Sequence, residues 1–274
     1  MEVTENQLPW LDQRHPNFSR WKRAREISIE RGKFVKSILG KVVDCNSLKI
    51  LDLGSGEGGT SKVLAENNDV VSFDISKERL RRQSESTENL ERLCGSALDL
   101  PFNKNSFDIV ILQDVIEHLP EKDNFPETIH HLLKDEGIVY LSTPNKFSIF
   151  NFLSDPHWGV PVISILSRKK IKKYFLRYFR ESEVTRKDIA ELNSLNDLYK
   201  LFDEKFKLQL YTKYSVKELF NGNKGIVWSN FHLRLVRMIS FFKLNKILIK
   251  ITNDKPGLLN RFFTPTFYLI LKKK

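Results

Sequence analysis

The chain has 274 residues, a formal net charge of +11 and 41% hydrophobic residues, an ordinary composition for a soluble globular protein. This length suits one large domain, or one domain with a sizeable insertion. The only two cysteines, Cys45 and Cys94, exclude a disulfide framework and a cysteine-rich metal centre, which fits a reducing compartment.

The N-terminal residues MEVTENQLPW lack a basic region followed by an apolar core, so we expect no secretory signal. The sequence also lacks a run of about 18 uncharged apolar residues, so we expect no membrane span. We therefore expect a cytoplasmic protein, with peripheral attachment to a membrane surface as an open alternative.

Charge is distributed unevenly along the chain. Residues 1–50 carry +4, residues 51–150 carry −8, and residues 151–274 carry +15. This asymmetry indicates different partners for the middle and last parts. The basic part would suit an anionic small molecule, an anionic lipid surface or nucleic acid. The plainer interpretation is that lysine-rich helices only keep the protein soluble.

Taken in chain order, the first half alternates helical and strand patterns. Residues 17–39 are predicted to form one amphipathic helix, with Ile27, Val35, Ile38 and Leu39 on its apolar face. Strands are predicted at 49–53, 69–74, 90–94, 107–112 and 137–142, and helices at 60–67, 77–86, 115–119 and 124–133. Such alternation is typical of a parallel sheet with helices on both faces.

After Pro144 the pattern changes. Residues 146–163 are predicted to form a long loop, 167–179 a helix with one basic face, and 214–220 a short helix with Ser215 as its N-cap. Further predictions are a helical or mobile stretch at 181–197, a turn at 221–225, a strand at 225–229, two short helices within 231–251 that break near 243–245, and a final strand at 266–271.

The segment KILDLGSGEGGTS, residues 49–61, contains the pattern G-x-G-x-x-G from Gly54 to Gly59. In nicotinamide-dependent dehydrogenases this pattern binds a pyrophosphate. Here Asp52 stands two residues before the first glycine, and a carboxylate disfavours a pyrophosphate but suits a cation. The glycines allow a ligand to approach the backbone closely.

Four segments in order resemble class I S-adenosylmethionine-dependent methyltransferases: ILDLGSGEGG, VVSFDIS, GSALDLPFNKNSFDIV with LQDVIEHLP, and LLKDEGIVYLSTPN. The resemblance covers residues 48–145 and is greatest to the branch with quinone-biosynthesis and glycan-modifying enzymes. It implies an α/β, Rossmann-like, seven-stranded, mostly parallel sheet with helices on both faces and a helical insertion or cap after the fifth strand. The expected units are an N-terminal helical segment (1–47), a cofactor-binding core (48–145), a basic helical cap or substrate region (146–213), and the helices and strands that complete the sheet (214–274).

The resemblance implies specific contacts to S-adenosylmethionine. Asp52 would lie near the amino group of the methionine moiety, Asp74 would bind the ribose, and Gln113 would present backbone to the methionine end. The full expected set is Asp52, Gly54, Ser55, Gly56, Gly58, Asp74, Ile75, Ser96, Ala97, Leu98 and Gln113. The alternative for Asp52 is a helix partner and for Asp74 a turn residue. Ser96 replaces the usual acid near the adenine, so any hydrogen bond there is uncharged.

Three residues are candidates for the acceptor side of the site. His118 follows the fourth strand and is either a general base or a structural hydrogen-bonding residue beside a structural Glu117. His157 lies in the loop after the fifth strand and is a candidate for catalysis and substrate contact, and Trp158 for substrate contact; the alternative is a lid packed by aromatic residues. No metal ligands are expected.

These observations predict a methyltransferase that acts on a small molecule, such as a sugar or a lipid-linked intermediate, with an anionic acceptor and peripheral membrane contact through basic helices. An RNA methyltransferase is an alternative, although no RNA-binding module is recognisable and nucleic acid is not expected as a partner. A non-catalytic S-adenosylmethionine-binding protein is another. A dehydrogenase fits the glycine pattern but not Asp52 or the segments at 95–110 and 112–120.

Overall fold

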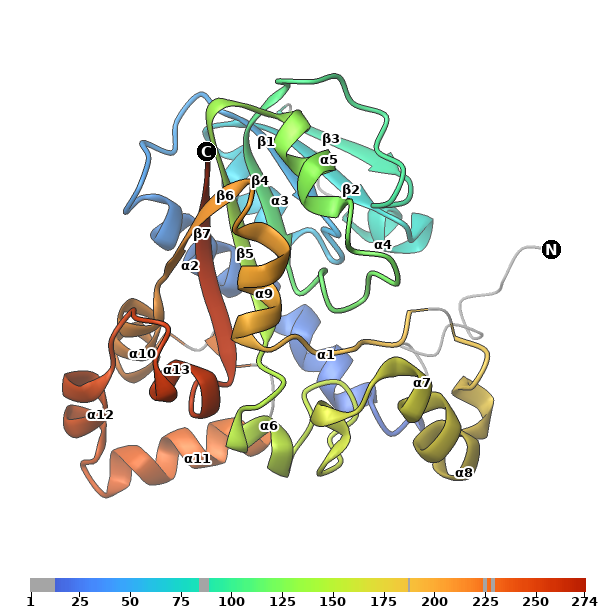
Figure 1. Cartoon of the computed structure of the whole chain (residues 1–274), viewed down its shortest axis with the longest axis vertical. Coiled ribbons are helices and arrows are strands. Elements are labelled where there is room, and N and C mark those ends of the chain that lie inside the picture. Colours follow the sequence, from blue (N-terminus) through green and yellow to red (C-terminus); the bar gives the residue numbers. More distant parts are fainter. Residues whose placement is uncertain (1–12, 84–88, 187, 224–225, 228–229) are drawn as a thin grey trace.

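The computed structural model describes residues 13–83, 89–186, 188–223, 226–227 and 230–274. Its centre is a seven-stranded sheet with the order β3-β2-β1-β4-β5-β7-β6 (Figure 1). The strands are β1 (Lys49–Leu53), β2 (Asp69–Asp74), β3 (Leu90–Cys94), β4 (Phe107–Gln113), β5 (Leu133–Pro144), β6 (Phe206–Leu210) and β7 (Thr266–Lys273). Of these described strands, β7 alone runs antiparallel to its neighbours, which are β5 and β6. The predicted seven-stranded, mostly parallel α/β sheet is therefore confirmed.

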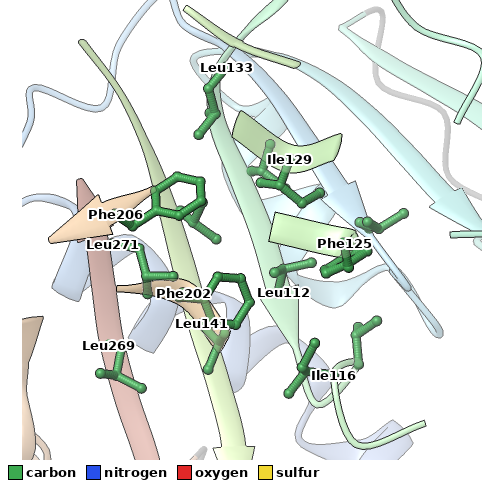
Figure 2. Packing of buried hydrophobic residues seen from close by; sticks show 14 of the residues in the cluster. Leu112, Ile116, Phe125, Ile129, Leu133, Leu141, Phe202, Phe206, Leu269 and Leu271 are labelled. Carbon is green, nitrogen blue, oxygen red and sulfur yellow. The ribbon is translucent and has the colours of Figure 1, made fainter. Parts of the chain in front are cut away.

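Helices cover both faces of the sheet because successive strand residues alternate sides. On one face, Leu112, Leu141 and Leu269 join a cluster with α5 (Phe125–Leu132) and α9 (Leu195–Phe202). Figure 2 shows this packing, with Phe125 and Ile129 of α5 against the strands. The opposite face is covered by α2 (Ser28–Leu39) and α3 (Gly59–Ala65). Strands between two helical layers read as nearly continuous apolar runs, which explains why their positions could be predicted from sequence.

The chain inserts two groups of helices around the last strands. Between β5 and β6 lie α6 (Ile149–Leu153), a continuous helical stretch made of α7 (Arg168–Lys170), η3 (Ile171–Leu176, π-helical) and α8 (Arg177–Phe179), and then α9. Between β6 and β7 lie α10 (Thr212–Phe220), α11 (Asn230–Phe241), α12 (Asn245–Ile251) and α13 (Leu258–Phe262). In Figure 1, α6, α7, α8 and α11 lie beyond the end of β5, on the side of the sheet where the parallel strands have their carboxyl ends. Among the described residues, no helix is long and apolar enough to cross a bilayer.

Several local predictions need correction. The helix expected over 17–39 is two helices, α1 (Phe18–Glu26) and α2, separated at Ile27. Residues 115–119 form turns, not a helix, and the loop expected over 146–163 contains α6. Ser215 is not an N-cap: α10 begins at Thr212, and the Ser215 hydroxyl donates to the Tyr211 carbonyl at 2.7 Å, one turn earlier.

Other local predictions are confirmed or gain detail. The break between two helices near residue 244 is confirmed by the ends of α11 and α12. Within the stretch expected to be helical or mobile, α9 begins at Leu195 with a capping box formed by Ser194 and Asp197. The strand β6 was not predicted, and it lies in the range expected to be a cap. The strand expected at 225–229 falls partly outside the described residues, and residues 226 and 227, which are described, do not form a strand.

Candidate active site

A cleft of about 510 Å³ opens at the carboxyl ends of β1, β2 and β4. The strand order reverses at β1, because β2 lies on one side of it and β4 on the other. Loops that leave neighbouring strands in opposite directions leave a crevice between them, which is where ligands bind in open α/β sheets. The cleft is further lined by α1 and α2 and by residues around 157 and 188.

The glycine loop after β1 takes backbone conformations that side chains rarely adopt. Gly54, Gly56 and Gly58 have φ angles of 74°, 55° and 73°. A Cβ at Gly54 would lie 2.5 Å from a Val115 methyl group, and one at Gly58 would lie 2.5 Å from the Gln83 amide carbon. The loop therefore needs glycine for both its conformation and its packing.

Gln83 supports this loop, a role that was not predicted. Its amide nitrogen donates to the Ser55 hydroxyl at 3.2 Å and to the Gly56 carbonyl at 2.8 Å, while its oxygen accepts from Ser72. Nothing in the sequence around residue 83 marks this position, because the contact joins the end of α4 (Lys77–Arg82) to a loop about 27 residues earlier.

Asp74 ends β2 and faces the glycine loop. Its carboxylate accepts from the Gly56 amide at 2.9 Å and from the Ser76 amide at 2.8 Å. Each carboxylate oxygen keeps lone-pair capacity for a ligand. Next to it, Ile75 is 76% exposed and Leu98 is 46% exposed, and both line the cleft. Two exposed apolar side chains beside a carboxylate suit a nucleoside, because the apolar side chains can pack against the flat base and the carboxylate can bind the polar ribose.

Asp52 is buried beneath the same loop. Its carboxylate accepts a hydrogen bond of 2.5 Å from the Ser61 hydroxyl. Burial raises the pKa of Asp52 to about 6, and the nearby negative charge of Asp74 adds to this rise. A ligand cation at this end of the cleft would stabilise the ionised form of Asp52.

The remaining cofactor-side positions also reach the cleft. The Gln113 side chain accepts from the Thr60 hydroxyl at 2.7 Å, which links the end of β4 to the start of α3. The Ser96 hydroxyl accepts from the Leu98 amide at 3.2 Å. The structure brings together in one cleft every predicted site residue: Asp52, Gly54, Ser55, Gly56, Gly58, Asp74, Ile75, Ser96, Ala97, Leu98, Gln113, His118, His157 and Trp158.

The helices that precede β1 contribute side chains that were not predicted to belong to the site. The cleft is lined from α1 and α2 and their flanks by Asn17, Arg20, Trp21, Ala24, Arg25, Ser28 and Arg31. Arg20, Ala24, Ser28 and Arg31 recur at spacings of three and four residues, which in the sequence indicates one helix face, although the structure divides that helix at Ile27. That recurrence of small and basic residues is the feature of the sequence from which their place at the site could have been predicted.

One wall of the cleft is the segment that follows α6. The Asp155 carboxylate accepts from the backbone amides of His157 and Trp158 at 2.8 Å each, and burial raises the pKa of Asp155 to about 6. Trp158 is only 4% exposed and packs its ring edge-on against Phe175 at 5.4 Å between centroids. Trp158 thus fixes this wall while most of its surface is covered.

Arg20 packs against the same wall. A Cβ at Gly159, which has a φ of 70°, would lie 1.8 Å from a guanidinium nitrogen of Arg20, so only glycine allows this approach. Burial lowers the pKa of Arg20, and the negative charge of Asp155 opposes that change. The wall therefore places a guanidinium beside the cleft.

His118 and His157 line the cleft and form a compact group with the buried Glu117 behind them. Glu117 is fully buried, its Oε2 accepts from the Thr143 hydroxyl at 2.9 Å, and burial raises its pKa to about 8. The His118 and His157 rings meet edge to face with centroids 5.1 Å apart. Burial lowers the pKa of both imidazoles, that of His157 more, so both rings are neutral at pH 7.

Comparison with known proteins finds a family match over part of the chain. A family model described as a methyltransferase domain matches residues 51–141. The glycine/sarcosine/dimethylglycine N-methyltransferase of Actinopolyspora halophila is 33% identical over 127 residues, which are 43% of this chain and 22% of that protein. A ubiquinone/menaquinone biosynthesis C-methyltransferase of Wigglesworthia glossinidia brevipalpis is 32% identical over 126 residues, 41% of this chain and 50% of that protein. The match thus spans half or less of the length of these relatives.

Solved structures share the fold at low sequence identity. An S-adenosylmethionine dependent methyltransferase from Mesorhizobium loti superposes with a TM-score of 0.56 at 12% identity, covering 87% of this chain and 96% of that one. A SAM-dependent methyltransferase from Methanosarcina mazei superposes with a TM-score of 0.50 at 16% identity, covering 86% and 96%. The sequence matches and this shared fold agree: residues 51–141 match a methyltransferase domain, and the chain shares the fold of S-adenosylmethionine-dependent methyltransferases.

Proposed function

We propose that this protein transfers a methyl group from S-adenosylmethionine to a small-molecule acceptor. The observation that carries the proposal is that a single cleft joins the glycine loop and Asp74 to a second wall formed by Arg20, His118 and His157. The first part fits a nucleoside that carries a positive charge, and the second part offers polar groups for another molecule. A group-transfer enzyme needs both ligands in one water-poor space.

The chain's residues fit the cofactor. The glycine loop has no room for a Cβ at Gly54, so backbone lies at the cleft surface. The Asp74 carboxylate would bind the ribose hydroxyls, and the exposed side chains of Ile75 and Leu98 would flank the adenine. Asp52 would supply negative charge near the methionine ammonium group.

The bound cofactor would supply a methyl group on a sulfonium, which an acceptor atom attacks from the side opposite sulfur. The protein's own work is to orient and desolvate the acceptor. The neutral imidazoles of His118 and His157 lie on the acceptor side, where either could take a proton from an acceptor hydroxyl.

We further propose an anionic acceptor, such as a sugar phosphate or a lipid-linked sugar. The support is the partly buried guanidinium of Arg20 on the acceptor wall, since arginine binds carboxylates and phosphates through a planar fork of donors. A cytoplasmic location is supported by Cys45 and Cys94, which are both free thiols in the structure.

Contact with a membrane surface through α11, α12 and α13 belongs to the same proposal. α11 has no buried residue, although seven of its twelve residues are apolar. Residues 230–263 carry seven lysines or arginines and a single acid, Asp254. Exposed large apolar side chains lie among these cations: Met238, Phe241, Phe242, Leu244, Ile247, Ile251, Leu258, Phe262 and Phe263. An apolar surface with cations around it suits the interface of an anionic bilayer.

Two measurements test the enzyme proposal. Calorimetry should detect binding of S-adenosylmethionine, and labelled S-adenosylmethionine incubated with fractionated cell extract should label a small-molecule or lipid fraction. The variant Asp74→Asn should bind at least about tenfold more weakly because it removes the charge beside the ribose. Asp69→Asn, at the exposed start of the same strand, is the matched control and should bind normally.

Other results would favour the competing functions. Label in RNA would favour the RNA methyltransferase. Binding without turnover on any fraction would favour a non-catalytic cofactor-binding protein. No binding to the folded wild-type chain would contradict all three functions.

A further inference from the structure

We propose that Glu117, His118 and His157 form a site for a divalent transition-metal ion. One ligand atom from each residue can be chosen so that all three lie within 4.8 Å of one another. Nε2 of His157 lies 3.9 Å from Oε1 of Glu117. These residues come from two separate segments, the loop after β4 and the wall after α6; His118 and His157 line the cleft, and Glu117 lies buried beside them.

The hydrogen bond of His118 prepares its ring for coordination. Nδ1 of His118 lies 2.9 Å from the backbone carbonyl of Asp188. A carbonyl can only accept, so in the neutral ring Nδ1 carries the proton and Nε2 has a free lone pair. Histidines that bind a metal through one ring nitrogen usually donate the other ring N–H to a carbonyl or carboxylate in this way.

Glu117 supplies a carboxylate oxygen that the protein leaves open. The side chain is fully buried, and its Oε2 accepts from Thr143 at 2.9 Å. Within the part of the chain that the structure describes, Oε1 has no hydrogen-bond partner. A buried oxygen without a partner is costly unless a ligand completes it. The oxygen that lacks a partner is the same one that lies beside His157.

The set of donors selects the class of ion. Two imidazole nitrogens and one carboxylate oxygen suit Zn²⁺ and its neighbours Co²⁺, Fe²⁺ and Mn²⁺ over Ca²⁺ or Mg²⁺. Ligand atoms about 2.1 Å from an ion stand roughly 3–3.5 Å apart, so closing the observed group requires shifts on the order of 1 Å. Of the charged neighbours, Arg186 is already paired with Glu183 and Asp188.

Three protein ligands leave coordination positions open toward the cleft, as in catalytic metal sites. This last step rests on the proposed function: with the ion bound, His118 and His157 would act as ligands and not as proton acceptors, and an acceptor hydroxyl bound to the ion would lose its proton more readily because a divalent ion stabilises the oxyanion. From the sequence, no metal ligands were expected. Residues 117, 118 and 157 have no recognisable metal spacing, and only the fold shows their proximity.

Titration of the metal-free protein with Co²⁺ tests the site directly, without any acceptor. One equivalent should bind and produce visible absorption bands, and Zn²⁺ should displace it. His118→Gln and His157→Gln should each weaken binding at least about 100-fold, since removal of a ligand exceeds the effect of removing an outer partner. Glu117→Gln, nearly identical in shape, should do the same with an unchanged melting temperature.

His131→Gln is the matched control, because His131 and Glu127 form a similar 2.8 Å pair on the exposed face of α5. Loss of Co²⁺ binding in this variant, with normal binding in His118→Gln, would overturn the proposal, as would no absorption change in the wild-type protein. S-adenosylmethionine binding is measured in parallel on each variant. If S-adenosylmethionine fails to bind but Co²⁺ binds as expected, the proposed function is contradicted and the metal site is still supported.

Discussion

Arg31 of α2 forms an ion pair with Asp114, the residue that directly follows β4. Asp114 has a φ of 58°, and its amide donates to the Ser142 carbonyl of β5 at 2.9 Å. Both charged side chains are largely buried at the cleft, with 20% and 15% of their surface exposed. The pair therefore joins a helix that precedes the methyltransferase domain to the carboxyl end of β4, where the site lies. The N-terminal helices are part of the site.

Replacing Arg31 with methionine should lower the free energy of unfolding by about 2 kcal/mol, because it leaves a largely buried carboxylate without its partner. Urea denaturation checks this. Lys33→Met is the control: Lys33 pairs with Glu30 at 2.8 Å on the same helix, but both side chains are more than half exposed. That change should cost less than about 0.5 kcal/mol. Equal effects of the two variants would contradict a special role for the Arg31–Asp114 pair.

Gly54→Ala should abolish cofactor binding. The new Cβ would lie 2.5 Å from Val115 and would also hold a left-handed backbone conformation. Gly222→Ala is the control, because Gly222 has a φ of 97° but none of the described residues comes within 4 Å of where its Cβ would lie. It should cost about 1 kcal/mol of stability from backbone strain alone and leave binding unchanged. Calorimetry with S-adenosylmethionine, beside thermal unfolding, separates the two effects.

The raised pKa of Asp52 predicts opposite effects on stability and binding. At about 6, this pKa lies above the ordinary 3.8, so between roughly pH 4 and 6 the folded state holds its proton more tightly than the unfolded state. The stability from Asp52 is therefore full below about pH 4 and is lost as the pH rises through 6. Asp52→Asn should raise the free energy of unfolding at pH 7 by on the order of 2 kcal/mol and still weaken cofactor binding.

Asp155→Asn is the matched control for this experiment. Burial raises the pKa of Asp155 to about 6 as well, so its removal should change stability over the same pH window. Asp155 lies on the acceptor wall, so cofactor affinity should stay normal. A loss of affinity in both variants, or in neither, would contradict the placement of Asp52 at the cationic end of the cofactor.

Of the first five strands, β1, β2, β4 and β5 could be predicted because each contains an apolar run that ends at a polar or glycine-containing segment, whereas β3 (LERLC) contains two charged residues and is only partly buried. The strands β1, β2 and β3 begin and end as predicted. In contrast, β6 alternates exposed and buried residues in FKLQL and, among the described residues, has one neighbouring strand, β7. A short edge strand of this kind has a weak apolar signal, and its partner lies more than 50 residues later in the chain.

The candidate site divides in the same way. Positions on the glycine loop and at strand ends follow from local sequence, and the cleft gathers them as expected. The roles of Gln83, Arg20 and Arg31 could not be predicted from local sequence, because these roles depend on contacts between distant segments. Trp158 was expected to contact substrate, and the structure places it at the cleft with most of its ring covered by Phe175 and the neighbouring helix. Local sequence gives a residue's chemistry, but its exposure is set by the fold.

The exposed apolar surface of α11 to α13 predicts binding to anionic membranes. Phe241 and Phe242, 80% and 62% exposed, precede the short turn before α12. Replacing both with serine should reduce partitioning onto vesicles that contain phosphatidylglycerol at least about tenfold, because each ring contributes about 1.5 kcal/mol or more on burial.

Tyr178→Ser with Phe179→Ser on α8 is the matched control at another exposed aromatic pair and should have a smaller effect. Co-sedimentation measures both, with phosphatidylcholine vesicles to isolate the charge contribution of Lys243, Lys246 and Lys250. Equal losses in the two double variants, or no binding by the wild-type chain, would contradict this surface as the membrane contact.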